Sequence, residues 1–492
     1  MTPTAFPGYF WDEKKRRYFK VERGGTAPTG AAWSSDNVKK RKLEDAASAE
    51  ATRKLNLNKN RIVRSRAVNQ LLMGGFFARE CGETVRDLPA AAFAQGLVDK
   101  GQIPLADNVR ESNTNVKHML VASKDHRDDI CTAYATLEER VVLSTYIPRD
   151  AKSGRVHTRF LSNHMDIPTD LRPNRELSIR QIAGITYSEK AHRVLVASRA
   201  PSSDVSTMMF APKRTSPDDT RPAWLIGYGG TTLYMHVRAY GSHAFNDYAA
   251  NVVCAAPRGN EYVFMVGSTR GLLHCGVDMS MGWSSPWGPQ HYYGTPDSFR
   301  DIFAVDFQPL HPDVVLFGGR PGHLFTGDLR EKAYKWNKLD LHNAITHIKP
   351  INEHQVLVSG LRNMLSVYDL RYNAQVRGRR TGLRPGGAGL ITPLFKVDEY
   401  KNAAHINIGL DLDKASGVVA AAHDDGKVAL YSVRSGKRLP SRDVDNIQSL
   451  YGAIHCLQFE HFPGDAMPTL FVGKHSNISA YTFGVDNPED EA

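Results

Sequence analysis

The stretch HQVLVSGLRNMLSVYDLR, residues 354–371, combines an apolar run ending in small residues, a polar turn, and a second run in which apolar and polar residues alternate. The same order occurs in DVVLFGGRPGHLFTGDLR, residues 313–330, and again in residues 417–434 and 469–484. A fifth copy, YVFMVGSTRGLLHCGVD, spans residues 262–278. Short β-branched and aromatic runs separated by polar turns predict paired β-strands. The chain therefore repeats one strand–turn–strand unit.

The spacing of these copies predicts the architecture. The second run of each copy ends at an equivalent residue, and measured between these residues neighbouring copies lie roughly 40 to 60 residues apart. The equivalent residues are Gly276, Asp328, Asp369, Ser432 and Thr482. A further apolar run precedes each copy, and two weaker copies lie upstream. Such units are typical of WD-repeat blades, and seven of them would close a ring without exposed sheet edges. We therefore expect an all-β, seven-bladed WD-repeat β-propeller over residues 116–484, which explains the period better than a solenoid or two β-sandwiches.

Composition argues against several functional classes. No run of 18 or more residues is wholly apolar, so we expect no membrane partner. The five cysteines are scattered and never CxxC-spaced, which favours a reducing compartment over a disulfide framework or a structural zinc. The 19 histidines form no HExxH motif and no visible catalytic constellation. We therefore expect neither an enzyme nor a bound cofactor.

The net charge of +10 is concentrated at the N-terminus, because residues 1–80 contain 17 Lys and Arg against 8 Asp and Glu. A Gly-, Ala- and Ser-rich composition predicts a mostly disordered basic linker over residues 23–60, followed by a short helix over 61–80. Residues 485–492 form an acidic tail. Four contiguous cations in the linker predict a nuclear import signal, with a solvated charge run as the alternative; they are Lys39, Lys40, Arg41 and Lys42. We expect a nuclear protein with a cytoplasmic pool.

Residues 8–22, GYFWDEKKRRYFKVE, place two aromatic-rich arms around a charged turn. This pattern predicts a small two-stranded hairpin. Because an isolated hairpin is marginally stable in water, its aromatic side chains need a surface to rest on. One interpretation packs them on the propeller or on the short helix near Leu71, and the other makes them a preformed docking element for a partner. The candidate docking residues are Tyr9, Phe10, Trp11, Tyr18 and Phe19.

Two consecutive copies end almost identically, in Asp328-Leu329-Arg330 and in Tyr368-Asp369-Leu370-Arg371. Equivalent positions on neighbouring blades project from one rim, where two guanidinium groups would suit the carboxylates of a partner. The alternative is that each Asp closes a turn and each Arg is merely solvated.

These endings resemble the docking box of WD-repeat substrate receptors of cullin-4 ubiquitin ligases. Together with the Gly-aromatic opening, the C-terminal copies look similar to the family of DDB- and cullin-4-associated factor four (WD-repeat protein twenty-one). The resemblance covers residues 8–22 and, more loosely, most of 180–484. It implies that the rim docks on the ligase's damage-specific DNA-binding protein 1 adaptor through Asp328, Arg330, Tyr368, Asp369 and Arg371. The family's Trp is replaced by Tyr368 in one box and by Gly327 in the other, which leaves the second box without its supporting aromatic.

The favoured hypothesis is therefore a non-catalytic receptor that presents an unknown protein substrate to a cullin-4 ligase and takes no small-molecule substrate. The alternative is a WD-repeat scaffold of another nuclear complex, in chromatin or ribosome assembly. In that case the basic tail would contact nucleic acid, a weaker expectation confined to that tail.

Overall fold

In a computed structural model the chain divides into two compact units, Met1–Val85 and Arg86–Ala492, and each is described by itself. The described residues are 8–12, 15–22, 32–44, 46–48, 50, 87–104, 115–122, 130–137, 139, 141–148, 177–178, 181–191, 193–199, 207–210, 235–236, 249–269, 271–277, 281–283, 301–331, 336–371, 389–462 and 465–484. The expected helix at 61–80 and the acidic tail at 485–492 lie outside them.

The smaller unit contains the hairpin that the aromatic arms predict. Strand β1 (Tyr9–Asp12) pairs antiparallel with β2 (Arg17–Lys20), with Phe10 opposite Phe19. The Phe19 ring stacks on Trp33, with centroids 4.3 Å apart. The hairpin is confirmed, and one of its aromatic side chains rests on a residue of its own unit that neither sequence interpretation considered.

Residues 35–44 form a helix, which corrects that part of the predicted disordered linker over 23–60. The Ser34 side chain accepts the backbone N–H of Asn37 (3.4 Å), as a helix N-cap does. The four cations, residues 39–42, lie within this helix and are exposed. Composition alone missed this helix because its anchor, Trp33, packs on the distant Phe19.

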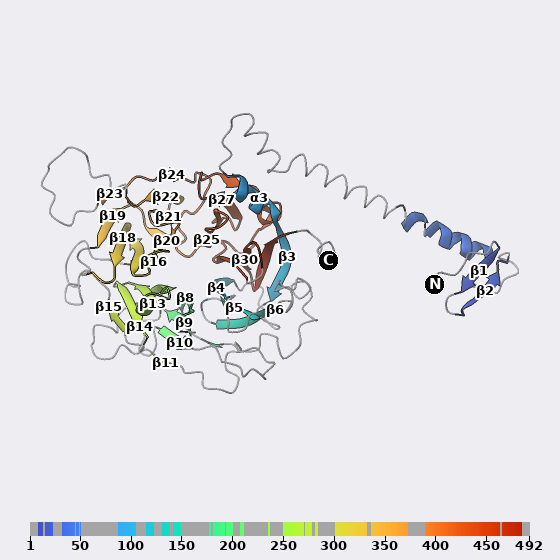
Figure 1. Cartoon of the computed structure of the whole chain (residues 1–492), viewed down its shortest axis with the longest axis horizontal. Coiled ribbons are helices and arrows are strands. Elements are labelled where there is room, and N and C mark those ends of the chain that lie inside the picture. The colour runs from blue at the N-terminus through green and yellow to red at the C-terminus, as the bar shows by residue number, and fades with distance from the viewer. Residues whose placement is uncertain are drawn as a thin grey trace, which may run out of the picture. The chain divides into compact units, whose positions relative to one another are not determined.

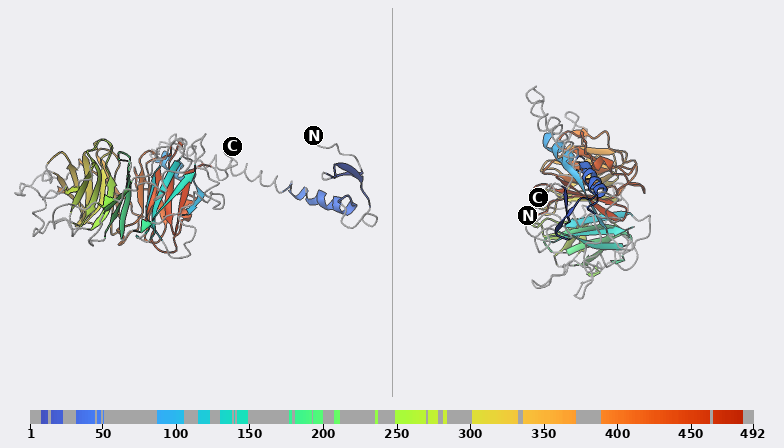
Figure 2. Two further views of the ribbon diagram at one scale, coloured as in Figure 1. Left: turned by 90° about the horizontal axis from the view of Figure 1, so that it is seen from below. Right: turned by 90° about the vertical axis from the view of Figure 1, so that its right-hand side faces the viewer.

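The larger unit is an all-β propeller arrangement, as predicted. Figure 1 shows its sheets placed around a common centre, and Figure 2 shows the same sheets from two other directions. The sheets before residue 300 contain β4 (Val116–Ala122), β5 (Ile130–Leu137), β6 (Val141–Pro148) and β7 (Leu177–Ser178); β8 (Ile182–Ser188), β9 (Arg193–Ser198), β10 (Thr207–Phe210) and β11 (Met235–His236); β12 (Ala250–Ala255), β13 (Tyr262–Ser268), β14 (Leu272–Gly276) and β15 (Met281–Trp283).

The sheets after residue 300 contain the C-terminal sequence copies, in the strand order that they predict. They are β16 (Asp301–Phe307), β17 (Val314–Arg320), β18 (His323–Asp328) and β19 (Asn337–Asp340), extended by β23 (Gly389–Leu390); β20 (Ile345–Pro350), β21 (Gln355–Gly360), β22 (Met364–Asp369) and β24 (Phe395–Lys396); β25 (Leu410–Asp413), β26 (Val418–Ala422), β27 (Val428–Ser432) and β28 (Arg438–Leu439); β29 (Leu457–Glu460), β30 (Thr469–Lys474) and β31 (Asn477–Phe483). A 3₁₀ turn, η5, covers Val444–Asn446.

The last sheet is completed by a strand from the other end of the unit. Strand β3 (Leu97–Pro104) pairs antiparallel with β31, so that Ile103 lies opposite Ile478. It follows helix α3 (Leu88–Gly96), whose Phe93 packs near Phe459. The unit therefore begins before the expected boundary at residue 116. This pairing joins the first and the last strand of the larger unit and covers an edge that β31 would otherwise expose.

The apolar core lies between adjacent sheets. One cluster joins Leu316 and Leu324, from the sheet of β16, to Ile345 and Val358, from the sheet of β20. Each sheet thus covers the next, which explains why a single repeat could not fold alone. Within the described residues, no helix is long and apolar enough to cross a membrane.

Candidate functional site

The rim residues begin where two equivalent strands end. Asp328 is the last residue of β18 and pairs with Val314, while Asp369 is the last residue of β22 and pairs with Gln355. The chain turns immediately afterwards. In each turn the carboxylate accepts the backbone N–H two residues on, from Arg330 or from Arg371, at 3.0 Å in both cases. Both aspartates therefore close the turns that follow their strands, as the alternative interpretation of these residues expects.

Each arginine also folds back onto its own aspartate as a two-pronged pair. Arg330 donates Nε–H to Asp328 Oδ1 (2.9 Å) and Nη2–H to Asp328 Oδ2 (2.7 Å). Arg371 makes the same two bonds to Asp369, at 3.0 and 2.7 Å. The side chains remain 69% and 61% exposed. We name these four residues the Asp–Arg rim.

The pairing changes the acidity of both aspartates. Hydrogen bonds from the Arg330 side chain hold the pKa of Asp328 below its usual range, and those from Arg371 do the same for Asp369. The same contact raises the pKa of Arg330. Both pairs therefore stay ionised at neutral pH, and each guanidinium is held in one orientation.

The surroundings of the two pairs differ in charge. Around Arg330 a second carboxylate lies close, with Asp313 Oδ2 3.6 Å from its Nε. The carbonyl of Asp313 accepts the backbone N–H of Leu329, and the carbonyl of His354 accepts that of Leu370. His354 therefore holds the position in the β22 sheet that Asp313 holds in the β18 sheet.

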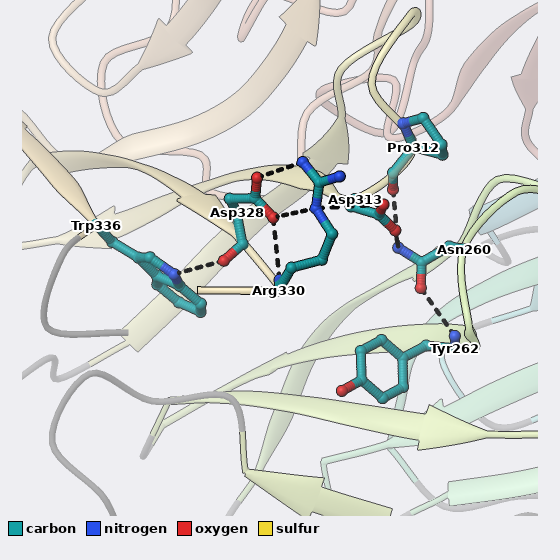
Figure 3. Close-up of polar contacts among 7 residues, drawn as sticks. All are labelled: Asn260, Tyr262, Pro312, Asp313, Asp328, Arg330 and Trp336. Atoms are coloured by element: carbon teal, nitrogen blue, oxygen red, sulfur yellow. Dashed lines mark hydrogen bonds and ion pairs between the residues drawn. The ribbon is translucent and has the colours of Figure 1, made fainter. Parts of the chain in front are cut away.

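Asp313 is held in turn by the neighbouring sheet (Figure 3). The buried Asn260 donates Nδ2–H to the Asp313 carboxylate (3.3 Å) and to the Pro312 carbonyl (2.8 Å). Its own Oδ1 accepts the backbone N–H of Tyr262 (2.8 Å). A polar chain thus runs from the β12–β13 loop to Arg330. Asn260 and Asp313 are not evident from the sequence, because only the folded propeller arrangement brings these loops together.

The expectation that Gly327 leaves its box without an aromatic is wrong. Trp336, which precedes β19, lies against Gly327, and its Nε1–H donates to the Asp328 carbonyl (3.0 Å; Figure 3). A Cβ at Gly327 would lie 2.4 Å from Trp336 Cδ2, so only glycine leaves room for the indole. In the other box Tyr368 itself is buried in the core between the sheets. The two boxes therefore obtain their aromatics from different positions.

The third strand of the next sheet ends in a serine instead of an aspartate. Ser432, the last residue of β27, accepts the backbone N–H of Arg434 (3.2 Å) and donates its hydroxyl to Asp87 Oδ1 (2.5 Å). Asp87 is the N-cap residue of α3. Here a serine bonded to the start of a helix stands where the preceding two sheets have the aspartate, and Arg434 occupies the position of the arginine.

The remaining site residues belong to the smaller unit, which is described by itself. The Trp11 and Tyr18 rings lie 4.7 Å apart, and the Arg41 guanidinium lies 5.3 Å from the centroid of Phe10. Lys39, Lys40 and Lys42 are exposed on the helix. The hairpin aromatics and the basic run thus belong to one small structure.

A hydroxyl–imidazole pair in the larger unit superficially resembles a nucleophile and its base. The Nδ1 of His347 lies 3.0 Å from Ser359 Oγ, and burial lowers the pKa of His347 to about 3. However, Ser359 is fully buried at 0% exposure, which keeps substrates away from its oxygen. Among the described residues no cluster of three or more His, Cys, Asp or Glu side chains could hold a metal ion. What the Asp–Arg rim offers chemically is oriented, exposed cations.

Neither models of protein families nor curated protein sequences give a match to this chain.

Proposed function

We propose that this protein is a non-catalytic substrate receptor of a cullin-4 ubiquitin ligase and that the Asp–Arg rim docks on the damage-specific DNA-binding protein 1 adaptor. One observation carries the proposal. The third strands of two successive sheets both end in an Asp–Arg pair, and the lengths of the three corresponding hydrogen bonds in the two pairs agree within 0.1 Å. Two solvated arginines would not need the same fork. The repetition supports a binding role beyond the closure of a turn.

The fork prepares each arginine for binding. A free arginine loses side-chain entropy when a partner fixes it, whereas a guanidinium already held by its aspartate loses less. Its planar donors can then meet carboxylate or carbonyl oxygens of the adaptor with defined geometry. The rim thus combines exposure with a fixed orientation, which is the requirement for a specific contact.

The proposal includes a closed ring of seven WD-repeat blades. The support for a closed ring comes from the first strand of each sheet. Each of these strands contacts the first strand of the next sheet, and the last contacts the first; in sequence they are β4, β8, β12, β16, β20, β25 and β29. A closed ring is rigid, so the two arginines keep their spacing. The receptor acts by proximity, because it holds a substrate protein near the ligase while catalysis belongs to the ligase. The exposed run from Lys39 to Lys42 directs it to the nucleus, with a cytoplasmic pool.

The test is a titration of purified adaptor against the wild-type chain and the Arg330→Ala/Arg371→Ala double variant. We expect the double variant to bind at least about thirtyfold more weakly, since a buried interface arginine commonly contributes about 2 kcal/mol or more. Arg442→Ala is the matched control, because its side chain is 68% exposed beside Asp443 but does not follow a third strand. Equal affinity of the folded double variant and wild type would show that other residues dock.

A further inference from the structure

The pairing register divides the hairpin into two faces. Successive side chains of a strand point to opposite sides, and partners directly across share a side. Tyr9 lies opposite Lys20 and Trp11 opposite Tyr18, so these four residues occupy one face. Phe10 and Phe19, also opposite each other, occupy the second face.

The second face is covered within the smaller unit. The Phe19 ring stacks on Trp33 at an interplanar angle of 8°, and the Arg41 guanidinium lies over Phe10. The Nζ of Lys15 lies 5.1 Å from the Trp33 ring centroid. The helix and its preceding tryptophan thus account for Phe10 and Phe19.

The first face exposes one aromatic ring, that of Tyr9, together with a cation, while Trp11 and Tyr18 are half-buried. Tyr9 is 52% exposed, the exposed Lys20 lies directly across from it, and Trp11 packs at a 56° angle against Tyr18. Tyr9 and Trp11 are two residues apart on one strand, which separates them by about 7 Å. We name Tyr9, Trp11, Tyr18 and Lys20 the aromatic face.

The positive charge of the N-terminal region indicates the kind of ligand that the aromatic face would bind. Residues 1–80 carry 17 Lys and Arg against 8 Asp and Glu, so an anionic partner is favoured. Adjacent exposed cations and aromatic rings fit a chain with both phosphates and unpaired flat bases. A duplex hides the faces of its bases, and an acidic peptide offers no flat ring to stack. We propose that the aromatic face binds single-stranded nucleic acid, with a base on Tyr9 and a phosphate at Lys20.

The experiment titrates the 492-residue chain into a labelled oligothymidylate of about twelve nucleotides and follows fluorescence anisotropy from about 50 to 200 mM salt. We expect Tyr9→Ala to weaken binding about tenfold, whereas Tyr9→Phe retains it because the stacking ring remains. Lys20→Ala should reduce the slope of log affinity against log salt by about one unit. Leu43→Ala, an exposed apolar truncation on the helix, should bind as wild type does.

Three outcomes would overturn the proposal. The first is unchanged affinity of Tyr9→Ala. The second is binding that disappears only when Lys39, Lys40, Arg41 and Lys42 are all replaced, which would identify simple charge attraction. The third is a duplex of equal length that binds as tightly as the single strand. Because Lys20→Ala leaves all the hairpin aromatics in place, its salt slope tests the phosphate contact even if Tyr9→Ala disturbs the hairpin.

Discussion

Arg330 and Arg371 make the same fork but differ in their neighbours, and this difference predicts unequal contributions to docking. Asp313 lies 3.6 Å from Arg330 and partly neutralises it, whereas the equivalent residue beside the other pair is His354. We expect Arg371→Ala to weaken adaptor binding by about 2 kcal/mol, roughly thirtyfold, and Arg330→Ala by less. Titration of the two single variants measures this difference.

Arg371→Lys is the informative control for that comparison. A lysine keeps the charge but lacks the planar fork, so affinity should recover only in part. Full recovery would mean that charge alone matters, and a larger loss from Arg330→Ala than from Arg371→Ala would contradict the neutralising role of Asp313.

Gly327 and Trp336 form the second residue-scale test. We expect Gly327→Ala to lower the free energy of unfolding by about 1 to 3 kcal/mol, because its methyl group would enter the space of the indole. In a Trp336→Ala background the same substitution should cost much less. Urea unfolding of the four proteins of this cycle measures the coupling. Equal costs in both backgrounds would show that the indole does not define the space at Gly327.

Partly buried histidines predict a loss of stability in acid. Burial lowers the pKa of His118 and of His347 to about 3, while an unfolded chain titrates near 6.5. Above pH 6.5 both states are neutral. Between pH 6.5 and 3 the unfolded state binds protons that the folded state excludes, so the free energy of unfolding falls as the pH falls. His347→Gln should reduce the decrease between pH 7 and pH 5 by on the order of 1 to 2 kcal/mol, measured by urea unfolding at both values. An unchanged decrease would contradict this.

At the scale of elements, the pairing of β3 with β31 indicates how far the chain can be shortened from its N-terminus. Removing residues 1–85 should leave the thermal midpoint of the larger unit almost unchanged, because that unit begins at Arg86. Removing residues 1–104 also deletes α3 and β3, with the buried Phe93 and Leu97, and leaves β31 without its outer partner. We expect a drop of several degrees or aggregation through the exposed edge. Equal midpoints for the two truncations would show that β3 is dispensable.

The same elements show what the sequence can reveal. Strands β17, β18, β21 and β22 are evident from the sequence, because their apolar runs recur around short turns in one continuous segment. Strand β3 is not, since its partner β31 lies at the far end of the chain. Trp336 escapes notice for a related reason, as it fills a space next to Gly327 that exists only after the strands pair. Contacts that depend on closure of the fold leave no local signal.

At the scale of the whole molecule, the two units are given different tasks by the two proposals. In these proposals the propeller arrangement would hold the rim that docks on the ligase adaptor, and the basic hairpin–helix unit would provide the surface for single-stranded nucleic acid. Because each unit is compact by itself, we expect changes in one to leave binding at the other intact. A chain without residues 1–85 should therefore still bind the adaptor.

The most direct test of the central claim is the mass of the complex formed by the purified chain and the adaptor, measured by light scattering during gel filtration. We predict a stoichiometric complex for the wild type and separate components for the folded Arg330→Ala/Arg371→Ala variant. If the wild-type chain and the adaptor elute as separate species, the receptor proposal is contradicted, and a scaffold of another nuclear complex takes its place.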